Sequence, residues 1–217
     1  MKISKDIVVI DLEATSARDE EGHQENNYII DVGAVYVDRE LEIVDRFSSL
    51  VKPRERITDQ IAELTGITNE MVEDAAEWDV VARAFQDWIR GRAGDLKKIK
   101  LAAWGAYFDI PLLRRLYRTY GLAYPFGGAA LDVKSVAFVW QALAGHRTDK
   151  ASVEHVAGLM GLKPEGAYHR AGVDAEVEAR ILQRCLCDLN QGAFLEFKKG
   201  APYSLVRLEI RGSERPS

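Results

Sequence analysis

The sequence predicts an α/β fold, with one mixed sheet of antiparallel and parallel strands covered by helices on both faces. Two observations carry this prediction. β-rich segments come first along the chain, and the later strand-like segment is separated from them by helical ones. With 217 residues, of which 47% are hydrophobic, the chain can form one domain with its own core. We expect this domain to span residues 1–195, and residues 196–217 to form an extension with one strand at 201–210 and a frayed tail.

The N-terminal part of the chain has the pattern of an antiparallel meander. Residues 6–11 (DIVVID) are apolar and β-branched between two acids, which is typical of a buried strand. Residues 28–37 and 41–51 are β-rich on either side of a three-residue connection, and they predict a hairpin. Between the first strand and the hairpin, residues 16–27 are polar and aperiodic, so we expect a loop there.

After Pro53 the pattern becomes helical. Thr58 can cap a short helix that runs through Leu64 and ends at Gly66, and Thr68 can cap the next turn. These capping residues predict two short helices in succession.

The remaining chain alternates helices with one more buried strand. Apolar residues from Trp78 onward fall on one helical face as far as Gly91 or Gly94. Residues 100–104 (KLAAW) predict the strand, and residues 110–120 the next helix. Three further helices are expected near residues 132–143, 152–160 and 172–190. The last of them carries a predicted core stripe with a four-residue repeat: Val173, Val177, Ile181, Cys185 and Leu189.

The composition excludes several classes of protein. The formal net charge is −5, from 29 Lys plus Arg against 34 Asp plus Glu. This charge excludes a broad basic nucleic-acid surface but permits a local contact with a strand end. Cys185 and Cys187 lack the spacing of a disulfide framework, and no segment has the pattern of a signal peptide or membrane span. We therefore expect a cytoplasmic protein with no membrane association.

Two acids stand where the first strand ends. Asp11 and Glu13 flank Leu12, and residues two apart on an extended chain point the same way. Taken alone, such a pair is more often a solvated edge or a helix cap. Asp11, however, follows four apolar residues of a buried strand, where an unpaired charge is costly and a metal ion would offset the cost.

Three more candidates lie at the starts of later helices. Asp109 follows the second buried strand, and the alternative interpretation is that it only caps the helix that begins IPLLRRL. His169 lies in the turn before the last helix and Asp174 in its first turn, next to Val173 of the core stripe. A lone histidine before a helix is usually structural, but His169 has another candidate as its neighbour.

In chain order, Asp-x-Glu after the first strand, Asp after the second, and His-x4-Asp entering a late helix resemble the three motifs of the DEDDh exonuclease family. That family includes ribonuclease T and the epsilon subunit of DNA polymerase III. The resemblance spans residues 7–189 and is closest to the Eri-1-like branch. Supporting motifs are DLEAT at 11–15, IIDVGAV at 29–35, LTGIT at 64–68 and WGAYFD at 104–109. Asp31 departs from the glutamate that is common in the family, and the loop at 16–27 is longer than in compact members.

The resemblance implies a ribonuclease-H-like sheet and a metal-dependent 3′-to-5′ exonuclease that releases nucleoside 5′-monophosphates from single-stranded 3′ ends. It assigns two Mg²⁺ or Mn²⁺ ions to four carboxylates: Asp11, Glu13, Asp109 and Asp174. Crowded carboxylates raise each other's pKa unless cations are present, and hard oxygen ligands suit these ions. His169 would be the general base, and the backbone of Ala14 and Thr15 would accept the terminal 3′-hydroxyl.

Several alternatives stay open at this point. Phe108 is either a base-stacking platform or a core residue. Arg114, Arg115 and Arg118 are typical of a solvated helix face, so they are left out of the predicted site. RNA or short oligonucleotides are favoured over DNA by the Eri-1-like resemblance alone, since no motif indicates a 2′-hydroxyl contact.

The chain's role and partners also have alternatives. It can act chiefly as a subunit of a polymerase or RNA-processing assembly, for example in DNA proofreading. A homodimer is an analogy with some relatives. If the acids are merely structural, divalent cations should not stabilise the protein.

Overall fold

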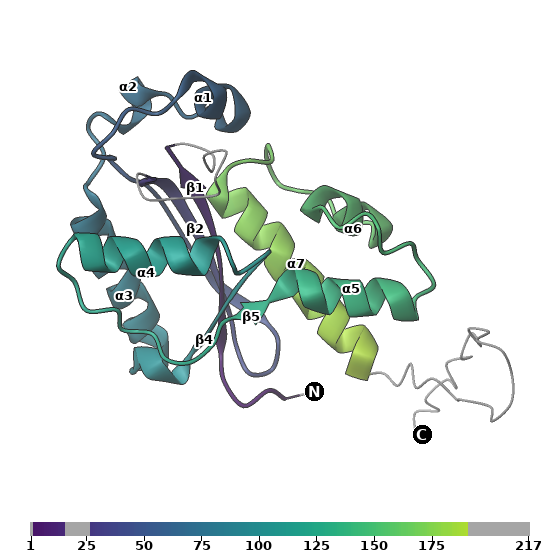
Figure 1. Cartoon of the computed structure of the whole chain (residues 1–217). Helices are drawn as coiled ribbons and strands as arrows, with labels where there is room; N and C mark the ends of the chain where they lie inside the picture. The colour runs from purple at the N-terminus through teal and green to yellow at the C-terminus, as the bar shows by residue number, and fades with distance from the viewer. Residues whose placement is uncertain (1, 16–26, 191–217) are drawn as a thin grey trace, which may run out of the picture.

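The computed structural model describes residues 2–15 and 27–190, which form a five-stranded mixed sheet with helices on both faces (Figure 1). The strands are β1 (Ile7–Ala14), β2 (Ile29–Val37), β3 (Ile43–Leu50), β4 (Lys100–Ala103) and β5 (Leu131–Asp132). Their spatial order is β3-β2-β1-β4-β5. The first three are antiparallel neighbours, whereas β4 runs parallel to both β1 and β5. The predicted fold class and the N-terminal meander are confirmed.

The helices lie close to their predicted bounds, except for a short 3-10 helix that the sequence analysis did not predict. They are α1 (Asp59–Thr65), α2 (Asn69–Val72), α3 (Trp78–Ala93), the 3-10 helix η1 (Leu96–Lys98), α4 (Asp109–Thr119), α5 (Val133–Leu143), α6 (Val153–Leu159) and α7 (Ala171–Asn190). Thr58 caps α1 by accepting a hydrogen bond from the Ile61 N–H, and Gly66 ends the helix with a left-handed φ of 69°. Among the described residues, none of the helices has both the length and the apolar character needed to cross a bilayer.

Two strands differ from their predictions. The sequence does not indicate β5, because a strand of 2 residues shows no pattern of its own. The hairpin's second strand begins at Ile43, later than predicted, because Leu41 is buried with a left-handed φ of 69° that no strand accommodates. The predicted strand at 201–210, most of the predicted loop at 16–27 and the domain limit at residue 195 lie outside the described residues.

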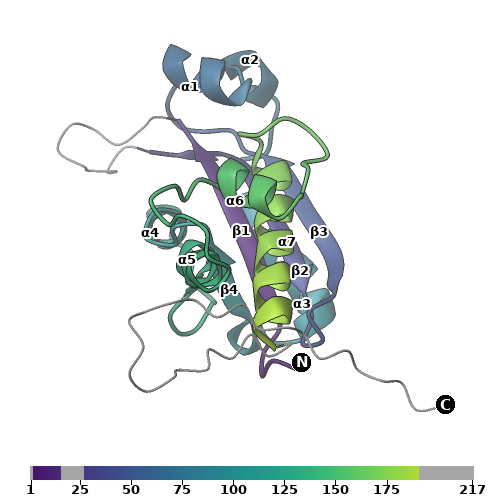
Figure 2. The same cartoon turned by 90° about the vertical axis from the view of Figure 1, so that its right-hand side faces the viewer.

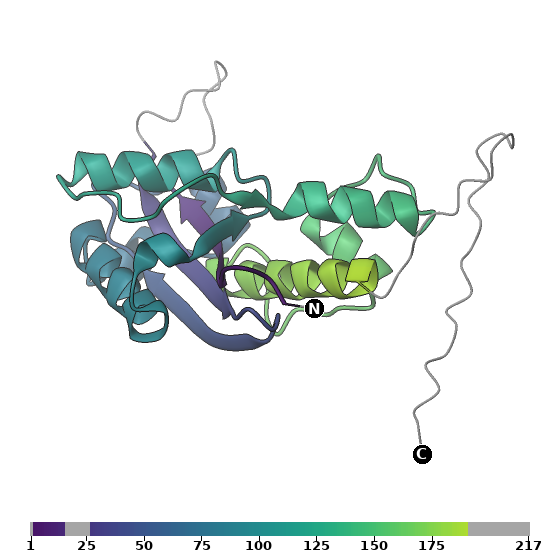
Figure 3. The same cartoon turned by 90° about the horizontal axis from the view of Figure 1, so that it is seen from below.

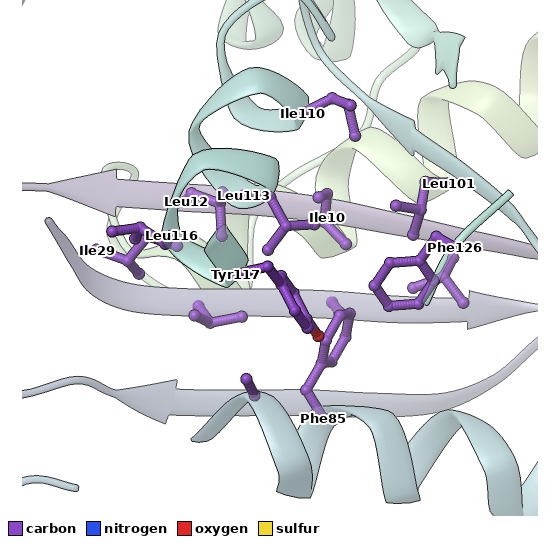
Figure 4. Close-up of a cluster of buried hydrophobic side chains, with 14 of the residues drawn as sticks. Ile10, Leu12, Ile29, Phe85, Leu101, Ile110, Leu113, Leu116, Tyr117 and Phe126 are labelled. Carbon is purple, nitrogen blue, oxygen red and sulfur yellow. The ribbon is translucent and has the colours of Figure 1, made fainter. Parts of the chain in front are cut away.

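The strand β1 is buried on both faces because its apolar residues alternate between two cores. Val8, Ile10 and Leu12 belong to the cluster shared with α3 and α4. Figure 4 shows Leu113 of α4 next to Ile10 of β1. Ile7 and Val9 point the other way, into the cluster that β1 shares with α5, α6 and α7. Figure 2 shows α7 lying along β1 and β2, and Figure 3 shows α5 beside it. The even-numbered side chains of β1 thus face α3 and α4, and the odd-numbered ones face α7.

The predicted stripe of α7 is only partly a core stripe. Val177, Ile181 and Cys185 are buried, whereas Val173 and Leu189 are half-buried. A repeat of four residues drifts off a face that has about 3.6 residues per turn, so the ends of the row rotate away from the sheet.

The helices α1 and α2 lie beyond the carboxyl end of β1 (Figure 1). They have a small core of their own with the adjoining strand end, made by Ile30, Ile57, Ile61, Ile67 and Val72. The Thr58 N–H donates to the Thr15 carbonyl at 3.2 Å, which ties the start of α1 to the residue that follows β1. The end of β1 therefore lies in the angle between these helices and α7.

Candidate active site

The alternation of β1 directs two acids toward α7. Because Ile7 and Val9 point to the α7 side of the sheet, Asp11 and Glu13 point there too. In the antiparallel register, Asp11 lies opposite Gly33 of β2, and Glu13 lies opposite Asp31. Three carboxylates therefore share one face of two neighbouring strands.

The absence of a side chain at Gly33 lets α7 approach these acids. A Cβ atom there would lie 1.9 Å from the Ala171 carbonyl oxygen, so only glycine allows the first residue of α7 to rest on β2. Since Gly33 pairs with Asp11, the N-terminus of α7 lies next to Asp11. The first turn of α7 then presents Asp174, which is 8% exposed, to the site.

His169 is held by the same helix start. Its backbone is left-handed, with φ of 63°, and its N–H donates to Asp174 Oδ2 at 2.8 Å. One ligand atom from each of Glu13, His169 and Asp174 lies within 4.8 Å of those of the other two. The imidazole is exposed to solvent while it lies beside two carboxylates.

Asp109 reaches the end of β1 from the side of β4, whereas Asp31 lies on the side of β2. The pairing of β1 with β4 ends at Val9, and beyond that point the backbone of Leu12 forms a hydrogen bond with the Asp109 carboxylate. Asp109 is the first residue of α4 and is 4% exposed, whereas the cap position belongs to Phe108. Its side chain therefore serves the strand end rather than the helix cap.

The carboxyl groups of this cluster all have raised pKa values, and burial is the largest cause in each case. Burial raises the pKa of Glu13 to about 7 and that of Asp109 to about 8. Burial also raises the pKa of Asp11, as do the charges of Glu178, Asp109, Glu13 and Asp174. The four predicted acids thus lie within electrostatic reach of one another.

This donor set fits divalent cations. Asp174 Oδ1 is buried and has no hydrogen-bond partner among the described residues. A buried carboxylate oxygen without a partner is costly, and ions such as Mg²⁺ and Mn²⁺ take oxygen ligands. A bound cation would also lower the pKa values that crowding and burial have raised.

Comparison with known proteins decides the family. A sequence model of the family described as "Exonuclease", of the RNase T type, matches residues 8–182. The chain belongs to this exonuclease family. The chain is an exonuclease domain of the 3′-to-5′ DEDDh type. The residues that the sequence analysis assigned to the DEDDh pattern are Asp11, Glu13, Asp109, His169 and Asp174.

The curated relatives of the exonuclease domain are much longer proteins. It is 29% identical over 189 residues to a PolC-type DNA polymerase III from Halalkalibacterium halodurans, covering 87% of this chain but 12% of that protein. A PolC-type polymerase from Clostridium perfringens is 30% identical over 177 residues, with 81% and 11% covered. The domain therefore corresponds to about a tenth of the length of these polymerases.

Solved structures of similar fold are nucleases. The nuclease domain of 3′hExo, a DEDDh family member bound to rAMP, superposes with a TM-score of 0.71 at 25% identity, covering 85% of this chain and 93% of that one. Cell-death related nuclease 4 superposes with a TM-score of 0.73 at 20% identity, covering 85% and 64%. The ribonuclease-H-like fold expected from the sequence is thereby confirmed.

The sequence analysis missed Glu178, a fifth acid at the exonuclease site. Glu178 is 1% exposed, and its burial together with the charge of Asp109 raises the pKa of its carboxyl group well above the ordinary value. The available signal was its place on α7, one turn after Asp174 and between the buried Ala175 and Leu182 on the same face. An acid within an apolar helix face is a candidate for a site.

Asp31 has a partner next to the histidine. Arg170 Nε lies 3.0 Å from Asp31 Oδ2, and the carboxylate is 1% exposed while the Arg170 side chain is 39% exposed. Burial raises the pKa of Asp31, and the Arg170 hydrogen bond and charge oppose this. The pair ties β2 to the residue that follows His169.

The other side chains considered from the sequence have contacts within the protein. Phe108 is half-buried and packs against the core under α4. The Arg114 guanidinium lies over the Tyr124 ring at 5.0 Å, and Arg115 donates to the Asn27 carbonyl. Both arginines therefore support the loops around α4.

Proposed function

We propose that the exonuclease domain hydrolyses phosphodiester bonds at single-stranded 3′ ends and releases nucleoside 5′-monophosphates, with RNA or short oligonucleotides favoured. The observation that carries the proposal is the convergence of Asp11, Glu13 and Asp109 from the sheet side with His169 and Asp174 from α7. The similarity to a nuclease domain bound to rAMP supports a terminal ribonucleotide as ligand.

The four carboxylates would hold two divalent cations, Mg²⁺ or Mn²⁺. In this assignment Asp11 would serve both ions, Glu13 and Asp174 chiefly the ion on the side of the attacking water, and Asp109 the other. When bound, such ions lower the pKa of water and neutralise charge on the phosphate and the leaving oxygen. The acids of this chain contribute by holding that positive charge at the carboxyl end of β1.

His169 would move the proton. An imidazole nitrogen would accept a proton from the attacking water as its oxygen bonds to phosphorus. The bond from phosphorus to the leaving 3′-oxygen would break, and this oxygen would take up a proton from solvent water. The hydrogen bond from the His169 backbone to Asp174 keeps the ring beside Glu13. Because the ring is exposed to solvent, it can pass the proton on to bulk water.

The end of β1 would receive the terminal nucleotide. All polar groups of Thr15 are bonded within the protein: its N–H donates to the Tyr28 carbonyl at 2.9 Å, and its hydroxyl and carbonyl accept from the N–H groups of Tyr28 and Thr58. Thr15 would therefore act by fixing the strand end, while the neighbouring backbone of Ala14 would face the 3′-hydroxyl. An acidic protein suits a short contact of this kind better than a long nucleic-acid track.

The first test removes the central acid. The wild-type domain should shorten a 5′-labelled oligonucleotide from its 3′ end only with added Mg²⁺ or Mn²⁺, and Asp11→Asn should abolish this. An Asp11→Asn protein that is folded by circular dichroism yet fully active would refute the assignment.

The second test addresses the general base. His169→Ala is expected to lower turnover about 10²- to 10⁴-fold. His155→Ala, on α6, is the matched control and should keep the wild-type rate. An unchanged rate in His169→Ala would remove this residue from the mechanism.

A second candidate function is DNA proofreading within a polymerase assembly, and the PolC-type relatives favour it. Rates on matched RNA and DNA strands, single-stranded and with a mismatched primer end, separate the two functions. A preference for the mismatched DNA end, together with co-purification of a polymerase, would favour proofreading. Light scattering decides between a monomer and a homodimer, and cell fractionation tests the expected cytoplasmic location.

A further inference from the structure

The strands β1, β4 and β5 stop pairing with one another at the edge of the sheet that carries the proposed site. The ladder between β1 and β4 ends at the pair Val9 and Ala102, and the ladder between β4 and β5 ends at Ala103 and Asp132. Trp104 follows β4 without a place in either ladder. Backbone N–H groups at such a point need other acceptors, because an unpaired buried donor is costly.

Carboxylates supply these acceptors. Trp104 N–H donates to Glu178 Oε2 at 3.1 Å, and Gly105 N–H donates to Asp132 Oδ1 at 2.9 Å. On the β1 side, the Asp109 carboxylate bonds to the Leu12 backbone. Three acids thus replace ladder partners at this edge of the sheet.

The turn held in this way leads directly to Asp109. Gly105 has a left-handed φ of 70°, and its carbonyl accepts the Phe108 N–H at 2.9 Å, which closes the turn one residue before Asp109. The position of Asp109 relative to β1 therefore depends on where Trp104 and Gly105 are held. Glu178 makes the contact between this turn and α7, the helix that also carries Asp174.

A purely structural role does not explain an ionisable group at this position. Glu178 is 1% exposed and lies among other acids, so burying its carboxylate opposes folding. An apolar side chain of the same size would pack there without that cost, and replacing buried charged groups in this way is often neutral or stabilising. What the apolar side chain would lack is the acceptor for Trp104.

We propose that Glu178 is a positioning residue of the exonuclease site, which accepts the Trp104 N–H from α7 and thereby sets the distance between Asp109 on the β4 side and Asp174 on α7. The proposal rests on the proposed function, because it assumes that these two acids must reach the same pair of cations. Misplacing a reacting group by about 1 Å can reduce the rate about 100-fold.

Two substitutions separate the hydrogen bond from the charge and the volume. Glu178→Gln keeps an acceptor oxygen for Trp104, whereas Glu178→Met keeps a similar volume but has no strong acceptor. Melting temperature, kcat, KM for an oligonucleotide and the Mn²⁺ concentration for half-maximal activity are measured for both. Glu176→Gln is the matched control. Glu176 lies on the same helix, but its carboxylate accepts a hydrogen bond of 2.7 Å from Arg46 and takes no part in the contacts around Trp104.

The expected result is a split between stability and activity. Glu178→Met should melt no lower than the wild type, yet lose about 10- to 100-fold in kcat and need more Mn²⁺, with KM little changed. Glu178→Gln, which keeps an acceptor oxygen for Trp104, should keep a kcat close to the wild-type value, and Glu176→Gln should behave as the wild type.

Two outcomes would overturn the proposal. If Glu178→Met keeps the wild-type kcat, the Trp104 bond does not position the site, and if Glu178→Gln is as slow as Glu178→Met, the charge rather than the bond is required. Should Glu178→Met fail to fold, Glu178→Ala is measured instead and the Gln variant still decides. A wild-type protein without metal-dependent activity would refute the proposed function rather than this inference.

Discussion

Arg170 follows His169, the proposed general base, and pairs with a buried carboxylate of β2. Removing its guanidinium would leave Asp31, at 1% exposure, without its cation. We expect Arg170→Ala to reduce the free energy of unfolding by about 1.5 to 3 kcal/mol, the range for hydrogen bonds to charged groups. The loss stays below that of a fully buried pair because the Arg170 side chain is 39% exposed and screened by solvent. Urea denaturation measures it.

The matched control is an ion pair of the same chemistry on the surface. Arg147 pairs with Asp149 where the side chains are 83% and 53% exposed, so Arg147→Ala should change the free energy of unfolding by less than about 1 kcal/mol. If both substitutions changed the free energy of unfolding equally, the burial of Asp31 would not strengthen its pair with Arg170. Activity adds a second readout, because only Arg170 is next to His169.

Single residues also show what sequence reasoning can and cannot reach. Asp11 and Glu13 could be assigned to one face because strand alternation fixes their direction. The place of Glu178 on the apolar face of α7 marks it as a candidate, but its partner could not be predicted, because the Trp104 N–H lacks a strand partner only beyond the end of the ladder between β1 and β4. Asp132 was missed for the same reason.

At the scale of elements, the site depends on how closely α7 approaches β2 at Gly33. A Cβ atom at Gly33 would meet the backbone of Ala171 at 1.9 Å, and backbone atoms cannot turn aside as a flexible side chain can. We expect Gly33→Ala to displace the start of α7, to reduce the free energy of unfolding by about 3 kcal/mol and to lower activity more than stability. Urea denaturation and the oligonucleotide assay measure the two effects.

Gly91 provides the control for this substitution. It lies inside α3, and a Cβ atom there would have no neighbour within 4 Å. Gly91→Ala should therefore stabilise the protein by about 0.5 to 1 kcal/mol, as expected for alanine replacing glycine in a helix. A Gly33→Ala protein as stable and active as the wild type would show that α7 can shift without harm to the site.

The elements differ in how far the sequence predicts them. The capping residues Thr58 and Gly66 define α1 because each acts locally. β5 has no local signal, since its two residues form a strand only by pairing with β4. The stripe of α7 was predicted with too regular a repeat, because the sheet selects a face that follows the true helical period.

For the whole molecule, the acids of the site make stability depend on pH. In the folded protein the pKa of Glu13 is raised from 4.5 to about 7 and that of Asp109 from 3.8 to about 8. Between about pH 4 and 8 the folded state therefore binds more protons than the unfolded chain, and the free energy of unfolding falls as the pH rises. Without divalent cations, we expect the melting temperature to be lower at pH 8 than at pH 5.5.

Divalent cations should reverse most of this fall, because they bind the deprotonated carboxylates of the folded state and stabilise it by mass action. The rise in melting temperature on adding Mg²⁺ should thus be small at pH 5.5, where the carboxyl groups hold their protons, and large at pH 8. Asp109→Asn removes one of the titrating groups and should flatten the cation-free profile. Two results would contradict this explanation: a cation-free melting temperature that rises from pH 5.5 to 8, or a Mg²⁺ effect of equal size at both pH values. Either would mean that titration of these carboxyl groups does not cause the dependence of stability on pH and on Mg²⁺.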